Sequence, residues 1–488
     1  MAEIQNIPIN EKLRDSNPKV NQNFKNINDQ LVEHIDSNAA HDAKDITYTG
    51  TVPADNASVA IDSINGRISQ IVSQAGDDNT EIVDSRGGYS VLGDRLSASD
   101  SKLVNKANRR WFDIKDYGAV GDGIADDTAS IAQALQEIKT SGGGVLYIPK
   151  GVYNNGNTIS LPSNTIVQGA GNGTTIIKVK GSATSANVFF MSAGTEKVVI
   201  KDLTIDGNKA NQAASNYAIL GYKAAYCTLD NVSIINQFGI GVGWSNSHHM
   251  TCRNVTIERC GDNKPGFWCE FDDNTSPWNT GFHTYENCES NYNDLDGFIF
   301  NCPNIKFINC KANYNGQNIG GGGALGAGGF YNDRSQSNVK FITCEANNNT
   351  EFGINAVLVN ALISNGSFNE NILSGICIRS GSGRIKILGC DCVNNGRYSG
   401  TPTNSGWGKA GIQFTGVAFL TITACGCYGV GSPNTQTYGI QSINTEASDF
   451  VAITGNNLKY NVNDDSNMGP GHTQAEHNIT NLKYDNNI

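Results

Sequence analysis

Residues 288–369 contain four spaced copies of one short pattern: CESN (288–291), CKAN (310–313), CEAN (344–347) and GSFN (366–369). Successive side chains of a strand point to opposite faces, so the first and third residues of each copy should face one way and the second the other. Asparagine tolerates the left-handed backbone conformation and can hydrogen-bond to stacked copies of itself. The pattern therefore predicts strands stacked in register, with cysteines forming an interior ladder and asparagines a second ladder beside it.

The pattern extends in both directions with a variable period of ~22–34 residues. The first strand of each coil is expected at residues 203–205, 232–234, 255–257, 288–290, 310–312, 344–346, 366–368, 390–392 and 425–427. The second strand is expected to open at Gly239, Gly266, Gly297, Gly329, Gly353, Gly375, Gly411 and Gly439. We expect the residues one and three after each glycine to point inward. Such coils bury their interior only against their neighbours, so the sequence predicts a single-stranded, right-handed parallel β-helix over residues ~111–460.

The composition excludes several classes of protein. The chain has 488 residues, 46 acidic and 35 basic side chains, and a formal net charge of −11. A chain of this length needs an elongated or repetitive core, and its acidity disfavours binding to nucleic acid through phosphates. The N-terminus lacks a basic segment followed by an apolar one, and no apolar run could span a bilayer. We expect no secretion signal and no membrane insertion.

The thirteen cysteines all lie between Cys227 and Cys427. An odd number in a long chain does not indicate a disulfide framework. The pairs at 390/392 and 425/427 lack the C-x-x-C spacing and nearby histidine of a zinc site. We therefore expect buried, reduced thiols, folding in a reducing cytoplasm, and neither a metal nor a cofactor.

Residues 1–110 have a different pattern, with two apolar runs at helical spacing. The runs are Val20, Phe24, Ile27, Leu31 and Ile61, Ile64, Ile68, Ile71. Isoleucine at both core positions favours coiled coils of three or more strands. The alternative is two amphipathic helices on a local core. We expect a coiled coil followed by a polar linker at residues 76–108.

Residues 111–153 read WFDIKDYGAVGDGIADDTASIAQALQEIKTSGGGVLYIPKGVY. Asp126 or Asp127 is expected to cap a helix that places Ile131, Leu135 and Ile138 on one face. VLYIP should form the strand that follows. The segment resembles the N-terminal module of the pectate-lyase-like, or pectin lyase fold, β-helix superfamily, in which the helix caps the first coil.

The resemblance implies an all-β protein with a helical N-terminal region. We expect four regions: a coiled-coil attachment and linker region at 1–110, the capping module at 111–153, the β-helix body at 154–455 and a C-terminal cap at 456–488.

Outward residues of the second strands should form two columns. The column four after the glycine contains Gly243, Glu270, Asn301, Asp333, Val357, Arg379 and Thr415, and the column two after contains Gly241, Trp268, Ile299, Tyr331, Asn355, Cys377 and Gln413. Glu270 and Asp333 are separated by one coil, so their Cα atoms are expected ~9.6 Å apart. Carboxyl groups ~6.5–9.5 Å apart suit inverting glycoside hydrolysis, because they leave room for the attacking water.

Other residues complete this candidate site. Trp268 and Tyr331 lie beside the carboxylates with ring faces available to stack on sugars. Asp272 continues the strand of Glu270 as a further acid, and Asn301 and Arg379 share its column as expected glycan contacts. The alternatives are acids that serve solubility and aromatic rings that form a trimer interface.

Three other motifs are assigned to turns and loops. The motif NDLDG, which contains Asp294 and Asp296, has the residue types that are typical of a turn. The glycine-rich run at 319–328 lacks the lysine of a phosphate-binding loop and is expected to flank the groove. His248 and His249 have no further ligands nearby in sequence.

A helical N-terminal region before a capped β-helix resembles bacteriophage tail spikes and appendage proteins. IPINEKLRDSNPKVNQNFKNINDQL (7–31) resembles the start of virion fibre proteins in phages of Gram-positive hosts, and RGGYSVLGDRL (86–96) resembles linkers before receptor-binding domains. The resemblance implies a homotrimer, folded in the host cytoplasm and joined to a virion tail or baseplate protein through its N-terminal region. Its partner would be a host surface glycan such as capsule, exopolysaccharide or teichoic acid.

Three functions compete. The first is a hydrolase-type depolymerase that uses Glu270 and Asp333 as acid and base. The second is a polysaccharide lyase on uronates, which needs a base and charge neutralisation, with Arg379 and the adjacent Arg334 as candidates. The third is a non-catalytic receptor-binding adhesin.

Overall fold

The computed structural model describes residues 64–70, 111–181, 187–271, 281–317, 328–397, 409–430, 436–443, 448–458, 461 and 482–485. The chain divides into two compact units, residues 1–103 and 104–488. In the first unit, residues 64–70 are helical, with Ile64 46% exposed. The other coiled-coil positions, except Ile68, lie outside the described residues, so the coiled coil stays a prediction.

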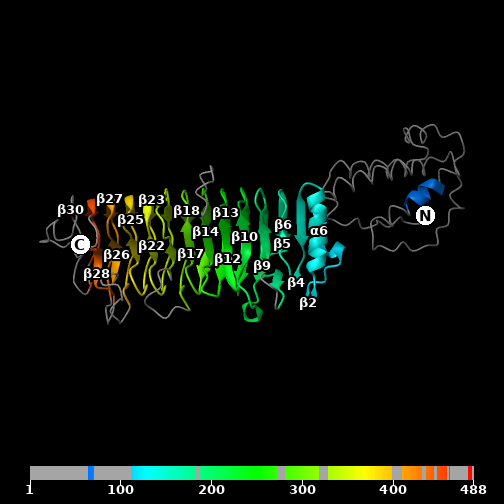
Figure 1. Ribbon diagram of the computed structural model, residues 1–488, viewed down its shortest axis with the longest axis horizontal. Coiled ribbons are helices and arrows are strands. Elements are labelled where there is room, and N and C mark those ends of the chain that lie inside the picture. Colours follow the sequence, from blue (N-terminus) through cyan, green and yellow to red (C-terminus); the bar gives the residue numbers. More distant parts are fainter. Residues whose placement is uncertain are drawn as a thin grey trace, which may run out of the picture. The chain divides into compact units, whose positions relative to one another are not determined.

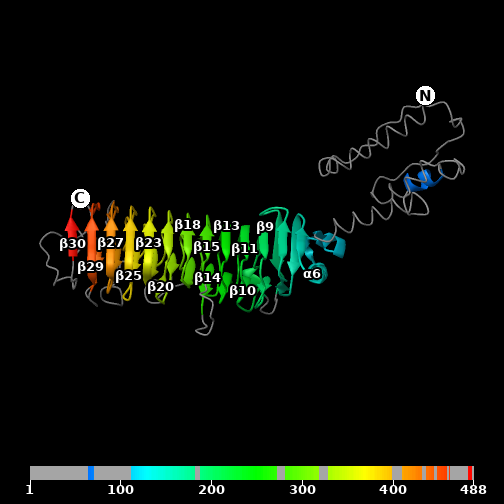
Figure 2. The same ribbon diagram turned by 90° about the horizontal axis from the view of Figure 1, so that it is seen from above.

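The second unit is built from short parallel strands stacked along one axis (Figures 1 and 2), which confirms the predicted β-helix. Its described strands fall into a 19-stranded and an 11-stranded sheet. The larger sheet contains β1 (Trp111–Asp113), β2 (Asp122–Asp126), β3 (Gly144–Ile148), β4 (Gly151–Asn155), β6 (Thr165–Gly169), β7 (Thr175–Val179), β9 (Val199–Asp206), β11 (Thr228–Ile235), β13 (Thr251–Glu258), β15 (Thr284–Glu286), β16 (Glu289–Asn291), β18 (Lys306–Ile308), β20 (Gln336–Ser337), β21 (Lys340–Ile342), β23 (Leu358–Ser364), β25 (Gly383–Leu388), β27 (Ala418–Thr423), β29 (Asp449–Thr454) and β30 (Leu482–Asp485). The smaller sheet contains β5 (Ile159–Ser160), β8 (Phe189–Met191), β10 (Asn216–Tyr222), β12 (Gly239–Ser245), β14 (Phe267–Glu270), β17 (Phe298–Asn301), β19 (Phe330–Tyr331), β22 (Ile354–Ala356), β24 (Ile376–Ile378), β26 (Ala410–Phe414) and β28 (Tyr438–Ser442).

Helix α6 (Thr128–Thr140) lies at the N-terminal end of the stack (Figure 1), as the sequence predicts. Its buried face carries Ile131, Leu135 and Ile138. The two capping candidates have separate roles. Asp126 accepts a hydrogen bond from the Thr128 backbone N–H at 3.1 Å, whereas Asp127 accepts from the Val120 N–H at 2.6 Å and anchors the preceding loop. Two short 3-10 helices, η2 (Ile114–Tyr117) and η3 (Lys209–Asn211), complete the described helical elements of this unit.

The cysteine ladder is confirmed. Parallel bridges connect the middle residues of successive first strands, from Glu289 through Lys311 to Glu345. The cysteines that precede these positions in the register are Cys288, Cys310, Cys344, Cys390 and Cys425, each at most 1% exposed. Reduced thiols of this kind pack as small apolar side chains.

The asparagine ladder after each triplet is also confirmed. The Oδ1 atoms of Asn291, Asn313 and Asn347 accept the backbone N–H of the asparagine one coil later, at 2.9, 2.7 and 2.7 Å. Their backbone is not left-handed, contrary to the prediction. The left-handed residue is the next one along, such as Tyr292 and Tyr314, both at φ 57°. The asparagine therefore precedes the left-handed residue of the bend, and its side chain hydrogen-bonds to the next coil.

A second ladder, which the sequence analysis missed, lies deeper in the wall. Its members are Asn293, Asn315, Asn349, Asn371, Asn395, Gln436 and Asn461, each at most 4% exposed. The Nδ2 group of Asn349 donates to Ala312 O at 2.9 Å and to Asn371 Oδ1 at 3.0 Å. Its Oδ1 accepts from the backbone N–H of Asn315 at 3.0 Å and from its Nδ2 at 3.2 Å. Each amide thus connects three coils, which offsets the cost of burying it.

The second strands of the smaller sheet match the predicted inward pattern. Their inward residues include Phe267, Cys269, Phe298, Phe300, Ile376, Ile378, Ile412 and Phe414, each at most 1% exposed. The opening glycines are needed because neighbouring coils approach closely. A Cβ on Gly297 would lie 2.8 Å from that of Ala312, and one on Gly353 would lie 2.5 Å from the Gly375 carbonyl oxygen.

The predicted register is wrong at one strand. Gly243 pairs with Trp268, and Ser245 pairs with Glu270, so β12 is shifted by two residues from its predicted place in the columns. The strand GIGVGW carries three glycines, and the one that occupies the position of Gly266 is Gly241 rather than Gly239. Only contact with the next coil decides between them.

The described chain ends with β30, which adds parallel to β29 and pairs Leu482 with Val451. Residues Leu482–Asp485 therefore form the last described strand of the larger sheet. No helix among the described residues is long and apolar enough to cross a membrane. The four regional boundaries stay predictions.

Replacing Asn349 by alanine should lower the free energy of unfolding by about 3 kcal/mol, because it leaves buried partners on Asn315, Asn371 and Ala312 unpaired. Guanidinium unfolding curves measure the effect. The control is Asn157→Ala, at an exposed position, which should change stability by less than ~0.5 kcal/mol. Equal effects of the two substitutions would contradict a stabilising ladder.

Candidate functional site

The candidate site lies on the outer face of the 11-stranded sheet. One column of residues runs across four coils: Trp268 pairs with Ile299, Ile299 with Tyr331, and Tyr331 with Asn355. In the neighbouring column, Glu270 pairs with Asn301, whose Oδ1 accepts the backbone N–H of Asp333 at 3.2 Å. The structure therefore brings together Glu270, Asn301 and Asp333 as predicted. Asp272 lies outside the described residues.

Arg334 joins the two carboxylates. Its Nη2 lies 3.0 Å from Glu270 Oε1 and its Nε lies 3.9 Å from Asp333 Oδ1. Its Nη1 also donates to the Phe271 carbonyl oxygen at 3.0 Å. From the sequence, Arg334 was predicted only as a candidate, beside Arg379, for the base or the charge neutralisation of a lyase. The structure makes it the residue that fixes the carboxylate pair.

The shared guanidinium limits the separation of the carboxylates. Glu270 Oε1 and Asp333 Oδ1 lie within roughly 9 Å of each other, since both contact one planar fork. That limit is compatible with an inverting arrangement. The two groups differ in environment, because the side chain of Glu270 is 18% exposed and that of Asp333 is 49% exposed.

Aromatic side chains lie beside the carboxylates. Trp268 is partly exposed, and its ring centroid lies 6.1 Å from that of Tyr217. Tyr217 lies over Gly243, where an added Cβ would meet its ring at 2.6 Å. Tyr217 was not predicted from the sequence; the only signal for it is Gly243, a residue without a side chain beneath its ring. Trp268 and Tyr217 together provide an aromatic surface next to Glu270.

Tyr331 and Arg379 meet further along the face. The guanidinium carbon of Arg379 lies 5.3 Å from the centre of the Tyr331 ring. Burial raises the pKa of Tyr331, and the nearby Arg379 partly opposes that rise. Beyond β19 the outward column is buried rather than exposed, contrary to the expectation of a solvated groove. Asn355, Cys377 and Gln413 are at most 1% exposed.

Two buried acids lie close to this face. Asp296 is fully buried and accepts the Gly328 backbone N–H at 2.7 Å, while its second oxygen has no hydrogen-bond partner. Burial raises the pKa of Asp296 well above its usual range, and the neighbouring Glu351 adds to the rise. The prediction of a turn role missed this burial. Asp294 instead pairs with Lys209 at 3.4 Å. Residues 318–327, in the predicted glycine-rich loop, lie outside the described residues.

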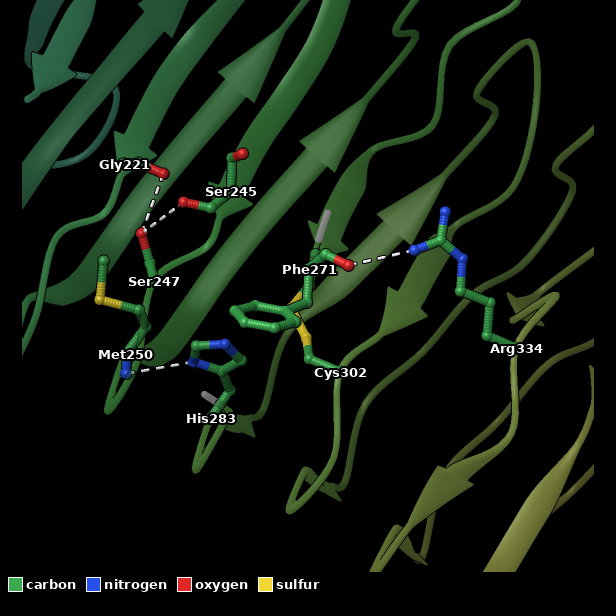
Figure 3. Close-up of a disulfide and its surroundings, with 9 residues drawn as sticks. Gly221, Ser245, Ser247, Met250, Phe271, His283, Cys302 and Arg334 are labelled. Atoms are coloured by element: carbon green, nitrogen blue, oxygen red, sulfur yellow. Dashed lines mark hydrogen bonds between the residues drawn. A yellow bond between two sulfur atoms is a disulfide. The ribbon is translucent and has the colours of Figure 1, made fainter. Parts of the chain in front are cut away.

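One group of side chains has the composition of a metal site. Ligand atoms of Cys269, His283 and Cys302 lie within 4.8 Å of one another, and all three residues are buried. Figure 3 shows His283 beside the sulfurs, with its Nδ1 accepting the Met250 backbone N–H at 3.2 Å. That contact leaves the proton on Nε2, so ligation would need a different protonation of the ring. The contact with Met250 therefore favours the tautomer with the proton on Nε2 and disfavours ligation of a metal through that atom.

The two sulfurs form a disulfide, Cys269–Cys302, with Cα atoms 6.5 Å apart. The prediction that all cysteines are reduced is wrong for these two. They are 33 residues apart in sequence, and only the stacking of β14 on β17 brings them within disulfide range. The bridge joins the strands that present Glu270 and Asn301. The other eleven cysteines are free and buried.

His248 and His249 stay a surface feature. Their Nδ1 atoms lie 2.9 Å apart, and the His249 ring stacks between Tyr226 and Phe282. Tyr226 and Phe282 are 50% and 46% exposed. No acid or cysteine joins this pair in a metal-ligating group among the described residues.

Comparison with known proteins agrees with the geometry. The family model described as rhamnogalacturonase A/epimerase, pectate lyase-like, matches residues 111–197. The solved A-module of mannuronan C-5 epimerase AlgE4 from Azotobacter vinelandii superposes with a TM-score of 0.59 at 19% identity, covering 78% of this chain and 99% of that one. The second unit therefore has a parallel β-helix fold, and its residues 111–197 match the pectate-lyase-like family model. At this identity, the superposition establishes the fold alone.

Two curated proteins are similar in sequence. The chain is 35% identical to mannuronan C5-epimerase AlgE3 of Azotobacter vinelandii over 164 residues, which are 30% of this chain and 9% of that protein. It is 26% identical to the preneck appendage protein of Bacillus phage PZA over 155 residues, 27% of this chain and 18% of that protein. The predicted resemblance to phage appendage proteins is confirmed. The matches span only a small part of each relative.

The disulfide can be detected by counting the free thiols before and after reduction. Alkylation of the unfolded chain without reductant should label eleven cysteines, and labelling after reduction should reach all thirteen. Mass spectrometry of the peptides should locate the protected pair at Cys269 and Cys302. Labelling of every cysteine before reduction would contradict the bridge.

His283 should make stability depend on acid pH. Burial lowers the pKa of His283 from 6.5 to about 3, so the unfolded chain takes up a proton near pH 6.5 that the folded chain refuses. Stability should therefore fall as the pH drops through this window, by about 2–3 kcal/mol at pH ~4.5.

Unfolding curves at pH ~7.5 and ~4.5 should show a smaller loss for His283→Asn than for wild type, because the substitution removes the refused proton. The exposed His249→Gln serves as the matched control and should keep the wild-type loss. An identical loss in all three proteins would contradict the assignment to His283.

Proposed function

We propose that this chain is a bacteriophage tail spike that binds and depolymerises a host surface polysaccharide. The observation that carries the proposal is the outer face, where Trp268 and Glu270 lie one coil away from Asn301, and Asn301 contacts the coil of Tyr331 and Asp333. Aromatic faces next to carboxylates are typical of sugar-binding grooves. Similarity to a mannuronan epimerase supports action on a polysaccharide, and similarity to a phage appendage protein supports a place on the virion.

The proposed reaction is glycoside hydrolysis. One carboxyl group of Glu270 and Asp333 protonates the leaving oxygen, and the other activates a water molecule on the opposite face of the sugar. Arg334 holds the two groups in position in the unliganded protein. A sugar that enters between them displaces part of this contact, which frees one carboxyl group to carry the proton. Asp272 is proposed as a further acid, and Asn301 as a hydrogen-bonding contact for the glycan.

A second candidate reaction is β-elimination on a uronate polymer. The observation that favours it is the presence of two guanidinium groups, Arg334 and Arg379, on one face. Elimination requires removal of the C5 proton and neutralisation of the adjacent carboxylate. Similarity to an enzyme named for C5 epimerisation fits this chemistry. The two candidates differ in product, because elimination leaves an unsaturated sugar that absorbs in the ultraviolet.

The assembly is part of the same proposal. We infer a homotrimer on the virion tail, held to a tail or baseplate protein by residues 1–110, with the β-helix directed at the host glycan. Similarity to the phage appendage protein supports this placement. Folding in the host cytoplasm would leave formation of the Cys269–Cys302 bridge to a later stage, outside the reducing compartment.

The test is release of reducing ends from surface polymers of Gram-positive bacteria. Glu270→Gln and Asp333→Asn should each reduce release by about 100-fold or more, because each removes one proton-transfer group. Glu345→Gln removes a carboxylate at an isolated parallel bridge, between Lys311 and Ser367, and should leave release unchanged.

The products separate the candidates. Release without ultraviolet absorbance supports hydrolysis, and release with absorbance supports elimination. If wild type binds the polymers and releases nothing, the protein is an adhesin and the carboxylates are surface residues.

A further inference from the structure

Large apolar side chains lie exposed along one edge of the larger sheet, outside the candidate site. The register places four of them in a single column, each 46–50% exposed: Tyr226, Phe282, Phe419 and Phe450. The rings of Phe419 and Phe450 stack with their centroids 4.7 Å apart. We call this line of residues the edge column, and the strand spacing gives it a length of about 40 Å. Exposed rings that recur along one line indicate contact with another molecule.

The backbone of the edge column makes these rings costly in an isolated chain. All four aromatic residues have left-handed backbone, with φ between 51° and 61°, which asparagine tolerates and bulky side chains disfavour. The same column contains Asn304, Asn338 and Asn360 in its middle coils, also with positive φ. Asn338 Nδ2 donates to Asn304 Oδ1 at 2.9 Å. The fold alone would accept asparagine throughout, so the rings point to a role outside the fold.

The larger sheet carries a group of lysines beside the middle of the edge column. Lys306 pairs with Lys340 in the register, and Lys386 lies two coils beyond Lys340. All three are exposed, and none forms an ion pair with another described residue. The outward residues of β18, β21, β23 and β25 include no acid. Like charges on neighbouring strands are destabilising, so this basic face, formed by the three lysines, favours an anionic partner.

Carboxylates lie across the adjacent bend of the same coils. Parallel bridges align five outward residues there: Glu289, Lys311, Glu345, Ser367 and Asp391. Lys311 lies 3.2 Å from Glu289, so the charges of these two residues balance. Glu345 and Asp391 form no ion pair with another described residue, and we call these two residues the acidic face.

The basic and acidic faces match coil by coil. Lys340 and Glu345 belong to one coil, separated by the bend at Thr343. Lys386 and Asp391 belong to another, two coils further on. A cyclic assembly with its axis parallel to the β-helix keeps every coil at the same height. Each lysine of one copy then lies level with the acid of the same coil in the next copy.

We propose that the basic face and the edge column of one copy pack against the acidic face of a second copy of this chain, closing a ring of three. The contact is heterologous, because it joins two different surfaces, and the rotation closes it. The rings of the edge column become buried, and the lysines gain anionic partners. The inference rests on the proposed homotrimer and names the surfaces that hold it together.

Zero-length cross-linking of the full-length protein tests the contact. A carbodiimide joins a lysine amine to a carboxylate where the two groups touch, so assembled wild type should give covalent dimers and trimers on a denaturing gel. Peptides from these bands should contain Lys386 joined to Asp391, or Lys340 joined to Glu345. The Lys311–Glu289 pair within one chain is the internal positive control for the reaction.

Lys340→Gln/Lys386→Gln should remove the covalent dimers, because it removes the amines that react. Lys139→Gln is the matched control, at an exposed lysine on α6 with the same change of charge. It should cross-link as wild type does.

Charge reversal measures the strength of the contact. Lys386→Glu places two acids opposite each other at every contact and should raise the protein concentration for half-assembly, measured by sedimentation, at least ~10-fold. Within one chain the new acid lies beside exposed Arg384, so the fold and its circular dichroism should stay unchanged. Lys386→Glu/Asp391→Lys restores the pair and should regain wild-type assembly. Neutralising one acid, as in Glu345→Gln, loses one exposed ion pair and should leave the trimer assembled.

The outcomes separate the contact from the other proposals. A wild type that sediments as a monomer would overturn both the contact and the homotrimer. A trimer without these cross-links, or one that Lys386→Glu leaves as stable as wild type, would overturn the contact and leave the homotrimer. Neither measurement uses polymer cleavage, so the depolymerase proposal holds or fails separately.

Discussion

The hydrogen bonds between successive coils are the constraint on which the molecule depends. Each strand of the 11-stranded sheet pairs in parallel with the next coil, so residues roughly 22–34 positions apart in sequence lie one strand spacing apart. This arrangement repeats every feature of a coil along the axis. The cysteine ladder, the two amide ladders and the outward columns are consequences of the same register. A site built on this face draws its residues from four coils and not from one motif.

The interior could be predicted from the sequence because it is periodic. Inward residues such as Phe267 and Phe298 must be apolar on every coil, so the alternation survives insertions between coils. The positions of the glycines predicted the register between coils less well. Three glycines in β12 fit the pattern equally well, and the choice of Gly241 depends on contact with Gly266, which no local rule contains. The bridge between Cys269 and Cys302 escaped prediction for the same reason, because it depends on a diagonal contact between coils.

The outer face was predicted in outline only. Alternation identified Glu270, Trp268, Tyr331 and Arg379 as outward residues, but it carries no information on where long side chains extend. Arg334 reaches from the turn after β19 to Phe271, two coils earlier. In this position its guanidinium forms an ion pair with Glu270. Likewise, outward direction did not mean exposure at Asn355. Burial there depends on what surrounds the face and not on the phase of the strand.

The buried asparagines of this protein differ in whether their side-chain amides are hydrogen-bonded. The amide of Asn349 makes four hydrogen bonds across three coils, and the amide of Asn371 repeats this pattern one coil later. Asn355 is as deeply buried as Asn349 and makes none with its side chain. A fold that satisfies its buried amides so regularly would satisfy this one too if stability alone selected the residue. Leucine or valine would fill the same space without unpaired polar atoms. The unpaired amide of Asn355 therefore costs the fold free energy that the paired amides of the ladder do not cost.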